Sequence, residues 1–206
     1  MPKKKRTTEG KIIQAAWKLF HKNGYEDTTV DEIIAASGTS KGSFYYYFRS
    51  KEALLNTLST FFDDQYREIS ENMDPNLSAS EKLFAASQKL FKIIETDVDI
   101  HLLGSLYASQ LTTEESRSLM DSKRYYFTWL RETISAGLKS GEFSNSSTLM
   151  ELVHIFALYE RALIYDWVLY SGSYSISEYS AVMLPLLLER FRKGIPRAGR
   201  ENIPEY

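Results

Sequence analysis

Cysteine is absent from this 206-residue chain, which also has only three histidines and no long apolar run. Without thiols, disulfides, thiolate catalysis and cysteine-based zinc sites are excluded. The scattered histidines show no metal-ligand spacing, so we expect no metal site and no cofactor. No segment reaches the roughly 18 apolar residues that span a membrane, and the basic start does not lead into a signal segment. We therefore expect a cytoplasmic protein without membrane contact.

Sequence motifs of common enzymes are also missing. The chain has no glycine-rich phosphate loop, no nucleophile elbow and no metal-binding helix. Its acidic residues fall at helix starts and on solvated faces instead of forming an isolated pair. We therefore expect no catalytic residues, and a helical enzyme is the least favoured functional class.

Charge is divided unevenly along the chain. Residues 1–55 carry ten Lys/Arg against six acidic residues, whereas the remainder carries 15 against 21. A basic end on an acidic body favours contact of the first part with a polyanion, although a solvated surface gives the same imbalance. The basic start, Lys3-Lys4-Lys5-Arg6, fits a flexible arm on DNA phosphates, a solubilising tail or a short nuclear signal.

Nearly every segment has helical periodicity. Four segments fit the S/T-x-x-E capping box, beginning at Thr29, Ser78, Thr112 and Ser175, and Gly24, Gly38 and Gly141 follow periodic runs as stop signals. The predicted helices are 8–23, 30–37, 41–47, 51–72, 79–95, 98–110, 113–140, 147–170 and 176–193. The fold class is therefore predicted to be all-α, with about nine helices.

The short helix predicted at 41–47 has an unusual surface. Phe44 and Phe48 lie four residues apart and can anchor it to a core. The rest of its surface carries more polar-tipped side chains than a small core uses: Lys41, Ser43, Tyr45, Tyr46 and Tyr47. With Gly42 allowing close backbone approach, such a helix suits a DNA groove, as the second member of a helix-turn-helix. Any single tyrosine could instead pack against the body.

The segment 9–55 resembles the DNA-binding domain of the TetR family of helix-turn-helix transcriptional regulators. The matching residues are Ala15-Ala16-Trp17, Leu19-Phe20, Gly24-Tyr25, Thr28-Thr29-Val30, Ile33-Ile34, Ser37-Gly38, Ser40 to Tyr45, Tyr47-Phe48, Ser50-Lys51-Glu52 and Leu54-Leu55. The resemblance implies a DNA-binding domain at 1–50 with the helix-turn-helix at about 29–48. A regulatory and dimerisation domain would follow at 51–193, and a loose tail at 194–206.

The resemblance also implies roles for individual positions. Thr29 caps the second helix and donates to a phosphate, and Lys51 supplies a further phosphate contact. Lys41, Gly42 and Ser43 occupy positions that read or approach bases. Tyr45 and Tyr47 occupy phosphate-contacting positions, and Tyr46 a variable position that often touches bases. Many relatives have His where Tyr47 stands, and tyrosine keeps a donor there without becoming cationic.

The predicted helix 147–170 is apolar over most of its circumference, which indicates burial on both sides. Together with helix 176–193 it looks like the helix pair through which TetR relatives form a homodimer, and Leu163 and Leu186 are predicted interface residues. A single intramolecular core is the alternative. A homodimer also suits DNA binding, since one short recognition helix reads only a few base pairs.

Aromatic residues between 84 and 167 exceed the usual need of a core, which favours a pocket for a small apolar or aromatic effector. The candidate ligand-binding residues are Phe91, His101, Tyr107, Trp129, His154, Arg161 and Tyr165. Each aromatic residue alone is equally explained as core, and each histidine as structural.

We therefore expect a regulator, most simply a repressor, that binds double-stranded operator DNA as a homodimer and releases it when a small-molecule effector binds. An effector-independent or architectural DNA-binding protein is the main alternative.

Overall fold

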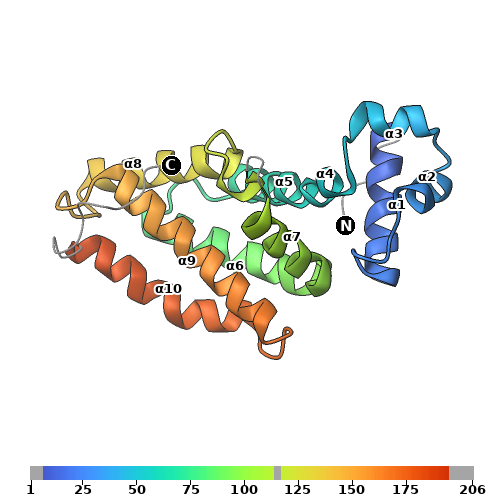
Figure 1. The fold of residues 1–206 in the computed structure, drawn as a ribbon. Coiled ribbons are helices and arrows are strands. Elements are labelled where there is room, and N and C mark those ends of the chain that lie inside the picture. The colour runs from blue at the N-terminus through green and yellow to red at the C-terminus, as the bar shows by residue number, and fades with distance from the viewer. Residues whose placement is uncertain (1–6, 114–116, 195–206) are drawn as a thin grey trace. The chain divides into compact units, whose positions relative to one another are not determined.

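The computed structural model describes residues 7–113 and 117–194, and these residues are helical with connecting turns (Figure 1). The all-α fold class is confirmed. The chain divides into two compact units, residues 1–61 with 97–119, and residues 62–96 with 120–206. The basic arm at residues 3–6 and residues 195–206 of the predicted tail lie outside the described residues.

The first unit contains the predicted helix-turn-helix. Its helices are α1 (Thr8–Asn23), α2 (Val30–Ser37), α3 (Lys41–Tyr47), α4 (Lys51–Leu55) and α7 (Ile100–Thr112), together with the start of α5 (Thr57–Glu71). Helix α1 packs against α2, α3 and α7, and α4 packs against α7. Ile12 and Phe20 of α1, Ile33 of α2 and Phe44 of α3 are buried, so the apolar stripes of three short helices share one core.

Local signals set the ends of these helices. Thr29 and Glu32 form a reciprocal capping box at the start of α2. Gly38 ends α2 in the left-handed conformation with φ 64°, which favours a residue without a Cβ. Ser40 then caps α3 by accepting the Ser43 N–H. The turn between α2 and α3 is therefore fixed by three consecutive sequence features.

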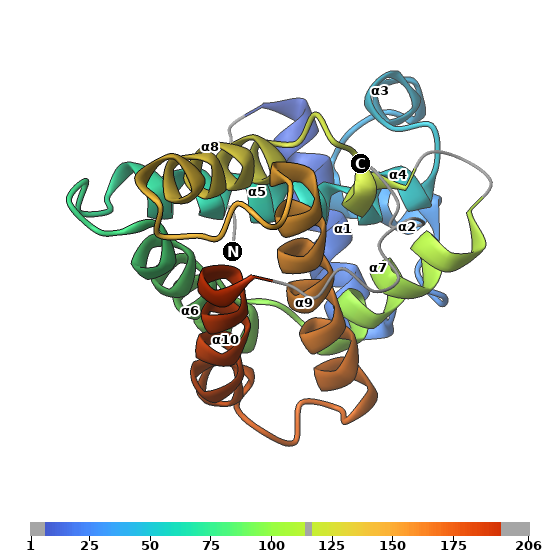
Figure 2. The ribbon, with the colours of Figure 1, turned by 90° about the vertical axis from the view of Figure 1, so that its left-hand side faces the viewer.

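The second unit is a helical body formed by the rest of α5 with α6 (Ala79–Asp97), α8 (Tyr125–Ser140), α9 (Leu149–Leu169) and α10 (Ile176–Lys193). Helix α9 packs against α8 and α10, and it runs beside α10 in both views (Figures 1 and 2). The interior is filled by fully buried phenylalanines, namely Phe91, Phe127, Phe143, Phe156 and Phe191.

Two predicted helices differ from the structure. The expected helix 51–72 is divided at Asn56, whose carbonyl accepts both the N–H and the hydroxyl of Ser59. The expected helix 113–140 is wrong in its first part, because α7 ends at Thr112 and α8 begins only at Tyr125. A short 3₁₀ helix, Ser118–Met120, lies between them. Residues 114–116, which carry part of the predicted capping box, lie outside the described residues.

Within residues 7–113 and 117–194, no helix is long and apolar enough to cross a membrane. Over the same residues, no group of three or more His, Cys, Asp or Glu side chains is placed to hold a metal ion.

Candidate nucleic-acid interface and regulatory centre

Helix α3 has one buried side and a broad exposed side. Phe44 is fully buried, whereas Tyr46 is 81% exposed, and Tyr45 and Tyr47 are also exposed. The Tyr45 ring lies edge-on to Phe44 at 5.2 Å, and the rings of Tyr46 and Tyr47 meet edge-on at 4.9 Å. The tyrosines therefore form an outward aromatic surface, and the internal core uses only the phenylalanine side of the helix.

The first turn of α3 brings together the other predicted DNA-contacting residues. The Lys41 ammonium lies 3.6 Å from the Asp31 carboxylate, and both side chains are exposed. Such a solvated ion pair contributes little to stability, so an anion can replace Asp31 at little cost. A Cβ added to Gly42 would meet only Ser40 Oγ, at 3.9 Å. Among residues 7–113 and 117–194, therefore, no packing contact requires glycine at this position.

Hydroxyl groups at the helix starts are engaged inside the protein. Thr29 Oγ1 accepts the Glu32 N–H at 3.3 Å and donates to Glu32 Oε2 at 2.8 Å. The backbone N–H of Thr29, and then its hydroxyl, hold the pKa of Glu32 below its ordinary value. The hydroxyls of Ser40 and Ser43 lie 2.9 Å apart. A phosphate contact by Thr29 would have to draw its hydroxyl hydrogen away from Glu32.

The predicted phosphate-contacting Lys51 is also engaged. Its ammonium donates to the carbonyl oxygens of Tyr25 at 2.7 Å and Glu26 at 3.1 Å. It also lies 4.3 Å from the centroid of the Tyr25 ring. Sequence inspection missed the Tyr25 partner, because the contact joins residues 26 positions apart.

The candidate effector-binding residues are divided between the two units. His101 and Tyr107 belong to α7 of the first unit, and the His101 side chain is exposed. The second unit holds Phe91, Trp129, His154, Arg161 and Tyr165. Phe91 and Trp129 are buried, His154 and Arg161 are partly exposed, and Tyr165 is 45% exposed. Burial and the charge of Arg161 lower the pKa of His154, which keeps its imidazole neutral at neutral pH.

A buried carboxylate, Glu160 of α9, is the polar centre of the second unit. It accepts hydrogen bonds from the hydroxyls of Tyr66 (2.7 Å), Ser87 (2.6 Å) and Tyr126 (2.6 Å). These donors come from α5, α6 and α8, so the centre joins four helices. Burial raises the pKa of Glu160, although the three hydroxyls and Arg161 act in the opposite direction. Trp129 lies beside this centre, 5.5 Å from the Tyr66 ring.

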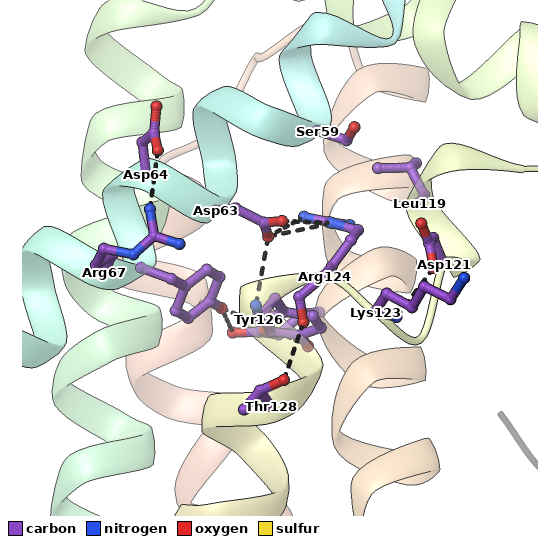
Figure 3. Close-up of polar contacts among 12 residues, drawn as sticks. Ser59, Asp63, Asp64, Arg67, Leu119, Asp121, Lys123, Arg124, Tyr126 and Thr128 are labelled. Atoms are coloured by element: carbon purple, nitrogen blue, oxygen red, sulfur yellow. Dashed lines mark hydrogen bonds and ion pairs between the residues drawn. The ribbon is translucent and has the colours of Figure 1, made fainter.

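Helix α5 is fastened to the start of α8 by further polar contacts. Asp63 accepts from Arg124 Nη2 at 2.8 Å and from Nε at 3.1 Å, as Figure 3 shows. One turn further along α5, the Arg67 guanidinium lies over the Tyr125 ring. Two turns along, the Ser70 hydroxyl lies 2.7 Å from the Tyr125 hydroxyl. These contacts and the bond from Tyr66 to Glu160 lie along one face of α5, since their spacing is three to four residues.

Large apolar side chains are also exposed along α9 and α10. Their spacing of three, four and seven residues places them in one stripe on each helix. The stripes consist of Leu158, Tyr165 and Leu169 on α9 and of Tyr179, Val182 and Leu186 on α10, all at least 45% exposed. Leu163, predicted at the interface, is instead buried within the protomer at 8% exposure.

Comparison with known proteins agrees with this arrangement. Residues 12–58 match the family model described as bacterial regulatory proteins, tetR family. The chain is 26% identical over 191 residues to the fatty acid metabolism regulator protein of Bacillus subtilis, covering 90% of this chain and 96% of that protein. It is 28% identical over 192 residues to the transcriptional repressor KstR2 of Rhodococcus jostii, covering 86% and 88%.

Solved structures share the fold over nearly the whole chain. FadR of Thermus thermophilus, a TetR-family repressor solved with lauroyl-CoA, superposes with a TM-score of 0.72 at 22% identity, covering 94% of this chain and 99% of that chain. FadR of Bacillus subtilis, solved with stearoyl-CoA, gives a TM-score of 0.69 at 22% identity, covering 90% and 98%.

A helix-turn-helix domain joined to a helical body defines a DNA-binding transcriptional regulator. Residues 12–58 match the DNA-binding domain of the TetR family of these regulators, and the near full-length relatives of the chain are regulators too. Its relatives are regulators and not enzymes, so the enzyme alternative is set aside.

Proposed function

We propose that this regulator is a repressor that binds operator DNA as a homodimer and releases it when a long-chain acyl-CoA binds. The outward surface of α3 carries the proposal. This seven-residue helix buries Phe44 and leaves three tyrosines and a lysine exposed. Burying that surface in a major groove places the tyrosine hydroxyls and the lysine ammonium beside phosphate oxygens and base edges, with which they can form hydrogen bonds.

The proposed base-reading residues are Lys41, Ser43 and Tyr46, with Gly42 allowing close approach. The absence of packing around Gly42 supports this role, because glycine lowers helix stability by roughly 0.5–1 kcal/mol relative to alanine without an internal benefit. Thr29, Tyr45 and Tyr47 form the proposed phosphate-facing set. Contacts of this second kind orient the protein on DNA without reading its sequence.

The proposed homodimer uses the exposed stripes of α9 and α10. Six large apolar side chains that are at least 45% exposed are an unusual feature for the surface of a monomer. A second copy of the chain covers them most simply, because a two-fold axis pairs each stripe with itself. A dimer also presents two copies of α3 to two half-sites, which raises affinity beyond that of one helix.

The acyl-CoA effector is proposed from the relatives and from the composition of the second unit. Two structural neighbours were solved with acyl-CoA, and one relative is a fatty acid metabolism regulator. A long acyl chain requires apolar walls such as Phe91 and Trp129. His154 and Arg161 are the polar candidates of the same unit, with His101, Tyr107 and Tyr165 as further candidates. The effector must bind the DNA-incompetent dimer more tightly than the DNA-bound one.

A titration of operator DNA tests the proposal. The operator is first obtained by sequencing the genomic fragments that the purified protein retains. Fluorescence anisotropy then follows a labelled operator duplex as lauroyl-CoA or stearoyl-CoA is added, with coenzyme A alone as the control. We expect release by the acyl-CoA compounds and none by coenzyme A. Operator binding that no acyl-CoA weakens would favour the effector-independent regulator, and retention of no specific fragment would contradict operator recognition.

A further inference from the structure

Lys51 begins α4 at a position where a cation is electrostatically disfavoured. The N-terminus of a helix carries partial positive charge, and acidic side chains are preferred in its first turn. Lys51 is nevertheless the first residue of α4, directly after its N-cap Ser50. Its ammonium turns away from the helix and donates to the carbonyls of Tyr25 and Glu26. The carbonyl dipoles therefore give this ammonium a negative partner in addition to Glu52, the acidic residue of the same turn.

The segment whose carbonyls accept the Lys51 hydrogen bonds is also held by contacts that do not involve Lys51. The Tyr25 ring lies edge-on to the buried Phe20 ring of α1, 5.2 Å between centroids. Burial, followed by the charges of Glu52 and Glu26, raises the pKa of Tyr25 to about 12, so its phenol stays neutral. Lys51 thus has two carbonyl oxygens and one aromatic face in fixed positions around its ammonium.

The same segment leads directly into the helix-turn-helix. Tyr25 O also accepts the Thr28 N–H at 3.4 Å, and the Thr28 hydroxyl donates to Gly24 O at 2.7 Å. Thr28 is buried and precedes Thr29, the N-cap of α2. A single ammonium therefore ties the connection between α1 and α2 to the start of α4, which packs against α7.

We propose that Lys51 is a positioning residue for DNA binding, acting through the connection between α1 and α2 and not through a phosphate. Two of its three N–H donors are taken by carbonyls, and the ammonium itself lies over the Tyr25 ring. These contacts of Lys51 with Tyr25 and Glu26, which we call the Lys51 clamp, hold Thr29 and α2 at the DNA-facing side. The proposal rests on the proposed DNA-binding function, and it replaces the phosphate contact that the family resemblance implies for Lys51.

The salt dependence of DNA binding separates positioning from direct contact. A lysine that neutralises a phosphate releases counterions, so its loss lowers the slope of log K against log salt by about one. A lysine that only positions other groups changes affinity and leaves the slope unchanged. The matched comparison is Lys51→Met against Lys41→Met, because Lys41 is an exposed lysine on α3. Both variants and Lys51→Arg are titrated on the operator duplex and on a random duplex of equal length.

We expect Lys51→Met to lower operator affinity about tenfold with an unchanged slope, as loss of hydrogen bonds to a charged group predicts. Lys41→Met should lower the slope, because the Lys41 ammonium enters the groove between the phosphate backbones and displaces counterions there. Lys51→Arg should restore most of the affinity, because guanidinium donors can reach the same carbonyls. Hydrogen exchange adds a measurement without DNA, in which Lys51→Met speeds exchange of the Thr28 amide and Lys51→Arg restores protection.

A slope lowered by about one in Lys51→Met, with Thr28 exchange unchanged, would overturn the proposal and return Lys51 to the phosphate contacts. Unchanged affinity in Lys51→Met would overturn it as well. If the wild-type protein binds neither duplex, the proposed function fails and this assignment fails with it. Wild-type binding together with a lowered slope in Lys51→Met rejects the positioning role alone.

Discussion

At the scale of single residues, two glycines with opposite surroundings give a sharp test of the α3 surface. Gly42→Ala should stabilise the protein by up to about 1 kcal/mol, because alanine favours helix and the added Cβ has open space. The same change should weaken operator binding, because the methyl group intrudes where the backbone approaches a base. Thermal unfolding and operator titration of one variant measure the two effects.

The matched control is Gly137→Ala in α8. A Cβ at this position would come within 2.4 Å of the buried Phe143 ring and 2.9 Å of Ala79, so this variant should lose stability by overpacking. If Gly42→Ala leaves operator affinity unchanged, Gly42 does not lie in the DNA interface, whatever effect the substitution has on unfolding.

The buried Glu160 predicts a pH dependence of stability. Burial raises its folded-state pKa above the ordinary carboxyl value, so the folded protein holds the proton more tightly than the unfolded chain. Its contribution is full below the ordinary value and is lost as pH rises through the folded-state pKa. Glu160→Gln removes this titration. The free energy of unfolding of the variant minus that of wild type should therefore increase as pH rises above the ordinary carboxyl pKa and through the raised folded-state pKa.

Denaturant unfolding at several pH values measures this difference, and Glu132→Gln, an exposed glutamate of α8, is the control. A difference that decreases as pH rises would mean that the three hydroxyl donors outweigh burial and lower the pKa. Glu160→Leu should be more damaging at every pH, because the hydroxyls of Tyr66, Ser87 and Tyr126 lose their acceptor at a cost of about 1–3 kcal/mol each.

At the scale of elements, α10 allows a test of the dimer that does not disturb the protomer core. Leu186 is 57% exposed in α10, so Leu186→Lys is tolerated in the isolated protomer. In the proposed interface it buries two like charges near a two-fold axis, at a cost of several kcal/mol. Light scattering should report monomer, and operator affinity should fall although the helix-turn-helix is unchanged.

Leu111→Lys is the matched control, because Leu111 is 73% exposed on α7, outside both stripes. It should leave the oligomeric state unchanged. A Leu186→Lys protein that stays dimeric would place the interface elsewhere. A charge at the buried Leu163 would not discriminate, because it would unfold the protomer first.

Helix positions were predictable where the sequence encodes local ends. The helices expected at 8–23, 30–37, 41–47 and 176–193 have the bounds observed for α1, α2, α3 and α10. Capping at Thr29 and Ser78 was visible because both partners lie within four residues. Apolar periodicity supplied the buried face of each helix, since burial in a helix follows its period.

The expected helix 113–140 failed because long-range contacts decide the conformation there. Arg117 Nε donates to Gln110 O at 2.7 Å, and Gln110 Oε1 accepts the Leu119 N–H at 3.0 Å. These contacts hold residues 117–119 against α7 and leave only the short 3₁₀ helix Ser118–Met120. Further along, Asp121 accepts the Arg124 N–H through its carbonyl and forms a turn just before α8. No local sequence pattern predicts partners of this kind.

In the candidate site, too, features set by local sequence were predictable and features set by distant partners were not. The exposed surface of α3 was predictable, because a helix too short to bury three tyrosines must expose them. The Glu160 centre and the Lys51 clamp were not predictable, because their partners lie 25 to 94 positions away in the chain. In the sequence alone, nothing distinguishes Glu160 from the other acidic residues of the predicted helices.

At the scale of the whole molecule, we propose that the first unit reads DNA and that the second unit binds the effector and forms the dimer. Helix α5 belongs to both units, since its first residues lie in one and its polar face in the other. In the second unit, that face meets Arg124, Tyr125 and the Glu160 centre. A ligand that rearranges this centre can act on α5, and through it on the spacing of two recognition helices, to which half-sites are intolerant.

The central claim is that the chain reads DNA sequence through α3, and selection from a pool of random duplexes tests it most directly. The wild-type protein should enrich a two-fold symmetric site whose half-sites lie about one helical turn or more apart. Lys41→Ala should enrich a site with different bases in each half, whereas Tyr47→Phe should enrich the wild-type site at lower affinity. Enrichment of no common sequence by wild type, or of an identical site by Lys41→Ala, would contradict the account.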